Sequence, residues 1–159
     1  MRENRKKILP YIVFVFIAEA VGVLSGLITR SGIEAYGALD KPGITPPAIV
    51  FPIVWTVLYA LMGIGAARVW SAPTSVSKIL GLRLFAYQLA VNFFWGIFFF
   101  NRQAFWFAFA WLILLLVLVV LMTAAFYRTD KPAAYLQIPY ILWLVFAGVL
   151  NALVAVMNR

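Results

Sequence analysis

Between Lys41 and Trp70 the chain reads KPGITPPAIVFPIVWTVLYALMGIGAARVW, and this stretch decides how the fold is interpreted. Its first seven residues are rich in proline and glycine, which predicts a loop. The apolar run Ala48–Trp70 can cross a bilayer as a helix, because a span needs about 20 residues. The stretch therefore predicts a stiff loop that leads directly into a membrane-spanning helix.

The start of this helix carries signals of its own. Thr45 is a residue type that caps helices, and Pro46 and Pro47 fit a first turn, where a missing amide costs nothing. Trp55 and Tyr59 lie four residues apart and therefore share one face of the helix. We expect the loop to end at a helical face that is aromatic and weakly polar.

The composition of the 159 residues is that of a membrane protein, because 65% are hydrophobic and 11% are charged. Five apolar runs are long enough to span, at residues 8–28, 48–70, 80–100, 104–127 and 133–157. The third and fourth runs are separated by Asn101–Gln103 alone, which predicts a tight hairpin. The sequence thus predicts one all-α domain, an integral membrane bundle of five transmembrane helices.

Several kinds of chemistry are excluded by missing residue types. The chain has no His and no Cys, so disulfides, thiolate or His-based catalysis and the usual zinc sites are ruled out. Its five acids are scattered, and no pair is spaced for hydrolysis. We therefore expect no metal site and no required cofactor. The net charge of +8 lies at the ends of the spans, which favours anionic lipid headgroups over nucleic acid as the partner.

The distribution of cations predicts the orientation in the membrane. With five spans, nine cations share the side of the N-terminus, and four, Arg30, Lys41, Arg102 and Arg159, lie on the other side. By the positive-inside rule the N-terminus is cytoplasmic, and the first loop and the C-terminus are outside, in a bacterial cytoplasmic membrane. The N-terminal segment also has features of a signal peptide, but its apolar run continues to Ile28, which favours an uncleaved first span.

Three helical faces combine indoles with polar or small residues. They are Trp55/Tyr59/Met62, Asn92/Trp95/Phe99 and Trp143/Ala147/Asn151. Polar side chains within a membrane face inward, so these faces should meet inside the bundle. Two interpretations stay open at this point: a cavity walled by indoles, or interhelical packing with asparagine hydrogen bonds.

Glu19 is an acid within the first span, about 12 residues into the helix. It is either a structural acid held by hydrogen bonds or a group for proton coupling or ligand contact. Small residues recur at packing distances, as Gly22/Gly26 on the first span and Gly63/Ala67 on the second. Such pairs let helices approach closely, within one bundle or between two copies.

Several blocks in this order resemble the TspO/MBR family, the tryptophan-rich sensory and translocator proteins. The blocks are Leu39–Pro42 with Thr45–Pro47, Phe51–Gly63, Asn92–Phe99 and Ile138–Asn151. The resemblance implies a five-helix bundle, usually a homodimer, with a pocket under the first loop for porphyrins, related tetrapyrroles and drug-like hydrophobic molecules. By position, the implied ligand-binding residues are Tyr36, Trp55, Asn92, Trp95, Phe99, Trp143, Phe146 and Ala147. Pro46 and Tyr59, in the same blocks, complete the candidate set.

The resemblance implies a membrane receptor or sensor that binds porphyrin as its ligand. Two alternatives stay open. One is a proton-coupled transporter that uses Glu19; the other is a light-dependent enzyme that degrades porphyrin through Trp55 and Trp143. The enzyme is the less favoured interpretation. Ala35 and Ile44 stand where many relatives carry tryptophan, and Leu150–Arg159 has no tyrosine for a sterol motif.

Overall fold

The computed structural model describes residues 2–158, with side chains from residue 7 onward. Its helices are α1 (Arg2–Tyr36), α2 (Val50–Ser71), α3 (Val76–Gly96), η1 (Ile97–Asn101), α4 (Phe105–Thr129), α5 (Lys131–Tyr135) and α6 (Ile138–Met157). In this part of the chain, five helical segments are long and apolar enough to cross a membrane. The predicted all-α bundle of five transmembrane helices is confirmed.

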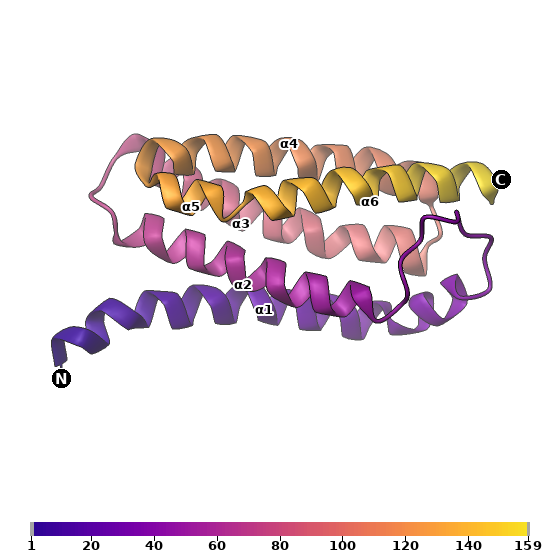
Figure 1. Ribbon diagram of the computed structural model, residues 1–159, viewed down its shortest axis with the longest axis horizontal. Coiled ribbons are helices and arrows are strands. Elements are labelled where there is room, and N and C mark those ends of the chain that lie inside the picture. The colour runs from indigo at the N-terminus through magenta and orange to yellow at the C-terminus, as the bar shows by residue number, and fades with distance from the viewer. Residues whose placement is uncertain (1, 159) are drawn as a thin grey trace.

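The helices run roughly parallel to one long axis (Figure 1). α1 packs on α2 and on η1, the π-helical continuation of α3, while α3 packs on α4 and α4 on α6. The predicted hairpin lies between η1 and α4, where Gln103 has a φ of 48°. Arg2, Arg5, Lys6 and Arg159, which contribute to the predicted charge asymmetry, have side chains outside the described residues.

The first loop differs from the sequence prediction at both ends. α1 continues to Tyr36, so the loop is shorter than expected, and α2 begins at Val50 after Ile49, which provides no side-chain cap. The Thr45 hydroxyl is buried without a partner among the described residues, and Pro46 and Pro47 precede the helix. The capping prediction was wrong: a cap at Thr45 would make Pro46 the first helical residue, and Pro46 is disfavoured in helical geometry because it precedes Pro47. Pro52 takes the first-turn position instead.

The last predicted span is also broken in two. α5 ends at Tyr135 and α6 begins at Ile138, with a turn between them. Pro139 lies in the first turn of α6 and has no amide to bond to the carbonyl of Tyr135, so a continuous helix would lose that hydrogen bond. The turn therefore separates the short helix α5 from the long helix α6, which carries Trp143.

Glycines bring α1 and α2 together as predicted, with one exception. A Cβ atom at Gly63 would lie 2.5 Å from Cα of Val15 and 2.8 Å from the carbonyl oxygen of Phe14, both on the backbone of α1. A Cβ at Gly22 would overlap the ring of Tyr59, whereas one at Gly26 would meet nothing within 4 Å. Gly63 and Gly22 therefore serve packing within the bundle, and Gly26 does not.

An ion pair joins the end of α2 to the turn between α4 and α5. Arg68 donates from Nε to Asp130 Oδ1 at 2.9 Å and from its terminal amino group to Oδ2 at 3.0 Å. Asp130 Oδ1 also accepts from the amide of Ala133 at 2.8 Å and so caps α5. The hydrogen bond from Arg68 lowers the pKa of the Asp130 carboxyl below its ordinary value.

Acid is therefore expected to destabilise the protein through Asp130. Because its pKa is lower in the folded state, the ionised carboxylate stabilises the fold above the ordinary pKa, and this contribution is lost as the pH falls through the folded-state value. Asp130→Asn should remove this part of the acid sensitivity, measured as thermal stability from pH 6 down to about 3. The control Asp40→Asn should leave it in place, since Asp40 bonds to Asn158 through its backbone.

Candidate functional site

A groove of about 500 Å³ lies between α2 and α6. Its walls are apolar and include Val54, Val57 and Leu58 from α2, and Leu142, Trp143 and Phe146 from α6. In Figure 1 these two helices run side by side, with α2 below α6. The volume is within the range of roughly 300–1,000 Å³ that is common for small-molecule sites. Two residues of the predicted site, Trp143 and Phe146, line this groove.

Trp143 is the one groove-lining residue whose side chain contains a hydrogen-bonding atom. Its ring packs against Phe51 of α2, with centroids 5.9 Å apart at 72°, and against Phe146, at 5.5 Å. The indole N–H is buried and has no acceptor within residues 2–158. A buried donor without a partner costs about 1–3 kcal/mol, so an acceptor supplied by a ligand would be stabilising here.

Trp55 lies at the same α2–α6 interface but is not among the residues that line the groove. Its ring packs against Tyr59, with centroids 5.5 Å apart at 32°, and against Tyr140 of α6, at 6.1 Å and 69°. The half-buried indole thus rests on two tyrosines of the core. Both indoles therefore contact the facing helix: Trp55 packs on Tyr140 of α6, and Trp143 packs on Phe51 of α2.

The two tyrosines belong to a buried chain of hydrogen bonds across the bundle. Tyr59 donates to Asn92 Oδ1 at 3.1 Å, and Asn92 Nδ2 donates to the Tyr140 hydroxyl at 2.6 Å. The Tyr140 hydroxyl in turn donates to Gln88 Oε1 at 3.0 Å. Asn92 and Gln88 are almost fully buried. In these contacts Asn92 holds the two rings on which Trp55 rests.

A second aromatic cluster lies nearer the first loop. Trp95 stacks on Phe99, with centroids 5.2 Å apart at 21°, and Tyr36 packs on Phe99 at 5.4 Å. The Trp95 indole donates to Asn151 Oδ1 at 3.3 Å, and Asn151 donates to the carbonyl of Phe105 at 2.8 Å. These predicted site residues are packed against one another, and the indole N–H of Trp95 has its hydrogen-bond acceptor.

The remaining candidates take separate positions. Ala147 is buried in the core, and Pro46 is half-buried in the loop. Glu19 is half-buried on α1, next to Ala18, which is in the core, and no hydrogen bond or ion pair is found for its carboxylate in the described structure. The predicted hydrogen-bonded acid is thus not observed.

The first loop is fastened to the end of α6. Asn158 accepts from the amide of Asp40 at 3.2 Å and donates to the carbonyl of Asp40 at 2.9 Å. Pro42 is buried, and the Lys41 ammonium lies over the ring of Tyr36, 5.4 Å from its centroid. We call the Asp40–Asn158 pair the loop latch.

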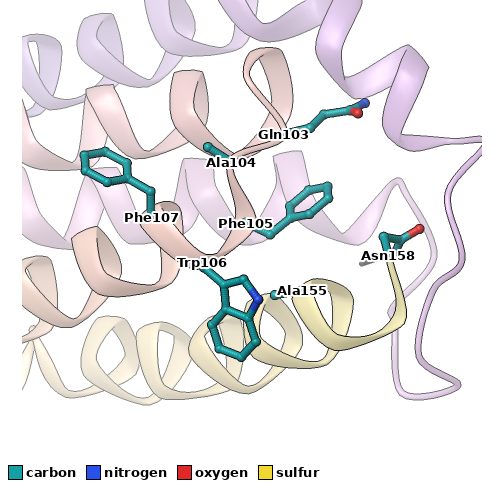
Figure 2. Close-up of a pocket in the computed structure, with 7 residues that line it drawn as sticks. All are labelled: Gln103, Ala104, Phe105, Trp106, Phe107, Ala155 and Asn158. Atoms are coloured by element: carbon teal, nitrogen blue, oxygen red, sulfur yellow. The ribbon is translucent and has the colours of Figure 1, made fainter.

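A second hollow, of about 280 Å³, lies beside the latch (Figure 2). Its lining comes from the segment before α4, the start of α4 and the end of α6, and includes Gln103, Trp106, Ala155 and Asn158. No residue of the predicted site lines this hollow.

The sequence predicted one chamber, and the structure divides its residues among the groove, the hydrogen-bonded core and the second aromatic cluster. Sequence reasoning did not select Phe51, Gln88 or Tyr140. Gln88 could have been found as an amide one turn before Asn92 on an apolar helix, and Tyr140 as a polar ring one turn before Trp143. Phe51 carries no such signal, because one more phenylalanine in an apolar span is unremarkable.

The sequence profile of the TspO/MBR family matches residues 14–157, nearly the whole chain. The chain belongs to the TspO/MBR family. Among similar TspO/MBR proteins, the tryptophan-rich protein TspO of Chlorobaculum tepidum is 34% identical over 155 residues, 96% of this chain and 98% of its own length. Family membership and the five apolar helices together establish an integral membrane protein.

Two further TspO/MBR relatives carry more descriptive names. The translocator protein of Bos taurus is 34% identical over 145 residues, which cover 89% of this chain and 86% of its own. The tryptophan-rich sensory protein of Cereibacter sphaeroides is 36% identical over 118 residues, 74% of this chain and 73% of its own. The family resemblance expected from the sequence blocks is confirmed.

Proposed function

We propose that this protein is a membrane receptor or sensor that binds porphyrins and related tetrapyrroles in the groove between α2 and α6. The observation that carries the proposal is the groove itself, an apolar site of about 500 Å³ lined in part by Trp143, whose buried indole N–H has no partner among the described residues. The sensory and translocator names of the relatives agree with a protein that responds to a bound molecule.

A tetrapyrrole matches this site in shape and in polarity. Its wide flat face suits walls of Leu58, Leu142 and Phe146, and aromatic contacts with Trp143 and Phe51 add stacking. A carboxylate or carbonyl oxygen at its rim suits the free indole donor. The outer carboxylates need cations beyond the groove, and Lys41 lies in the loop that leads into α2.

The homodimer, the cytoplasmic N-terminus and the bacterial membrane stay predictions from the sequence and belong to this proposal. Transport through Glu19 and light-dependent degradation through Trp55 and Trp143 also stay predictions. Neither is favoured by a specific contact, since the described structure shows no hydrogen bond or ion pair of the Glu19 carboxylate. Turnover of porphyrin in light, compared with turnover in the dark, separates degradation from binding.

Trp143→Phe is expected to weaken protoporphyrin binding about tenfold, because it removes one buried hydrogen-bond donor worth about 1.4 kcal/mol. The measurement is a titration of the purified protein by quenching of tryptophan fluorescence. Trp70→Phe is the matched control, since Trp70 is exposed at the far end of α2. Absence of saturable quenching in the wild type, or an equal loss in the control, would contradict the proposed site.

A further inference from the structure

The groove opens sideways, toward the surface that faces lipid. Val57 on one rim is 53% exposed, and Leu142 on the other is 65% exposed. Both residues lie near the middle of apolar spanning segments, Val50–Ser71 and Lys131–Met157. The opening is therefore at the depth of the hydrocarbon core, where acyl chains and dissolved apolar molecules are the neighbours.

The end of the groove near the first loop is obstructed instead. Phe51, in the first turn of α2, packs edge-on against Trp143. The first loop is also held to the end of α6 by the two hydrogen bonds of the latch between Asp40 and Asn158. A ligand that arrived from the loop end of the groove would have to displace the Phe51 ring from Trp143.

We propose that ligands enter the groove laterally from the bilayer core, between Val57 and Leu142, while the first loop stays latched. The inference takes the identity of the ligand, a flat apolar tetrapyrrole, from the proposed function. Lateral passage exposes no backbone polar group, because both rims are intact helices whose side chains alone must move. The substrate class is therefore a molecule that partitions into membranes before it binds.

The route can be tested with two obstructions, one at each opening. The natural sequence has no cysteine, so Asp40→Cys with Asn158→Cys provides the sole thiols, and a short bifunctional thiol reagent then locks the loop to α6. Val57→Phe with Leu142→Phe narrows the lateral opening. Val149→Phe is the control, because Val149 is an exposed residue of α6 outside the groove. The probe is protoporphyrin, followed by stopped-flow tryptophan quenching in vesicles.

Locking the loop is expected to leave the association rate within about twofold of the unlocked protein. The narrowed rim should slow association about tenfold, because the two added rings stand in the passage that the ligand must cross. The control should behave as the wild type. A tenfold slower association in the locked protein, or an unchanged association rate at the narrowed rim, would overturn lateral access.

A second measurement does not depend on porphyrin. In vesicles of phospholipids brominated near the middle of the acyl chain, Trp143 should contribute a quenched component that Trp143→Phe removes. If Trp143 is not quenched, the groove is closed to the hydrocarbon, and the inference fails whether or not porphyrin binds. If Trp143 is quenched but porphyrin does not bind, the proposed ligand is wrong and the lateral opening stands.

Discussion

Gly63→Val is expected to force α1 away from α2 and to lower the free energy of unfolding by about 3 kcal/mol. The added Cβ alone would lie 2.5 Å from Cα of Val15 and 2.8 Å from the carbonyl oxygen of Phe14. Both atoms belong to the backbone of α1, so no side-chain rotation can relieve the overlap. The measurement is unfolding in mixed micelles of increasing SDS content, followed by circular dichroism.

Gly26→Val is the matched control for this prediction. It introduces the same side chain on α1, where an added Cβ meets nothing within 4 Å. The control should change stability by less than about 1 kcal/mol, since it affects helix propensity and no packing contact. Equal losses at Gly63 and Gly26 would show that the close approach of α1 and α2 is not what Gly63 provides.

Asn92→Leu should lower the free energy of unfolding by about 2 kcal/mol, because it removes both hydrogen bonds that join Tyr59 and Tyr140. The Tyr59 hydroxyl would be left in the core without its acceptor. We also expect a loss of near-ultraviolet circular dichroism, since Trp55 rests on both of these rings. The same SDS titration measures the stability, and a spectrum of the native protein measures the order of the rings.

A double-mutant cycle separates the hydrogen bonds from the change in shape. Once Tyr59→Phe has removed the hydroxyl, Asn92→Leu should cost at least 0.5 kcal/mol less than it does alone, because the unpaired donor is no longer present. Strictly additive losses would mean that Tyr59 and Asn92 do not act as one unit. In that case the buried chain of hydrogen bonds would not hold Trp55.

The predicted site was assembled from three helical faces, each with residues expected to point into the bundle. Tyr59, Asn92 and Phe99 are buried, as inward-facing residues should be. What the faces could not show is the distance between helices. Where aromatic residues are close enough, their rings pack against one another, as those of Trp95 and Phe99 do. Where α2 and α6 stand farther apart, their residues line a groove instead.

Local rules also competed with one another in the first loop. Thr45 suits a helix cap and proline suits a first turn, yet Pro46 would be the first helical residue and precedes Pro47, which disfavours helical geometry there. The helix therefore begins later, at Val50, and Pro52 occupies the first turn. The sequence contained a capping signal at Thr45 and a steric conflict at Pro46-Pro47, and the steric conflict prevailed because it acts directly on the backbone.

The sequence by itself determined the membrane class, the five spans and the family, because hydrophobic length and blocks of residues along one chain are local properties. The tertiary structure decided that Trp143 lines a groove, that Asp130 pairs with Arg68 and that the first loop bonds to Asn158 at the end of α6. Those outcomes depend on spacings between helices, set by contacts such as Gly63 against α1 and Arg68 with Asp130, which join residues far apart in the chain. A local glycine pattern indicates that two helices can approach closely, but it does not say which helices meet or how far apart the others stand.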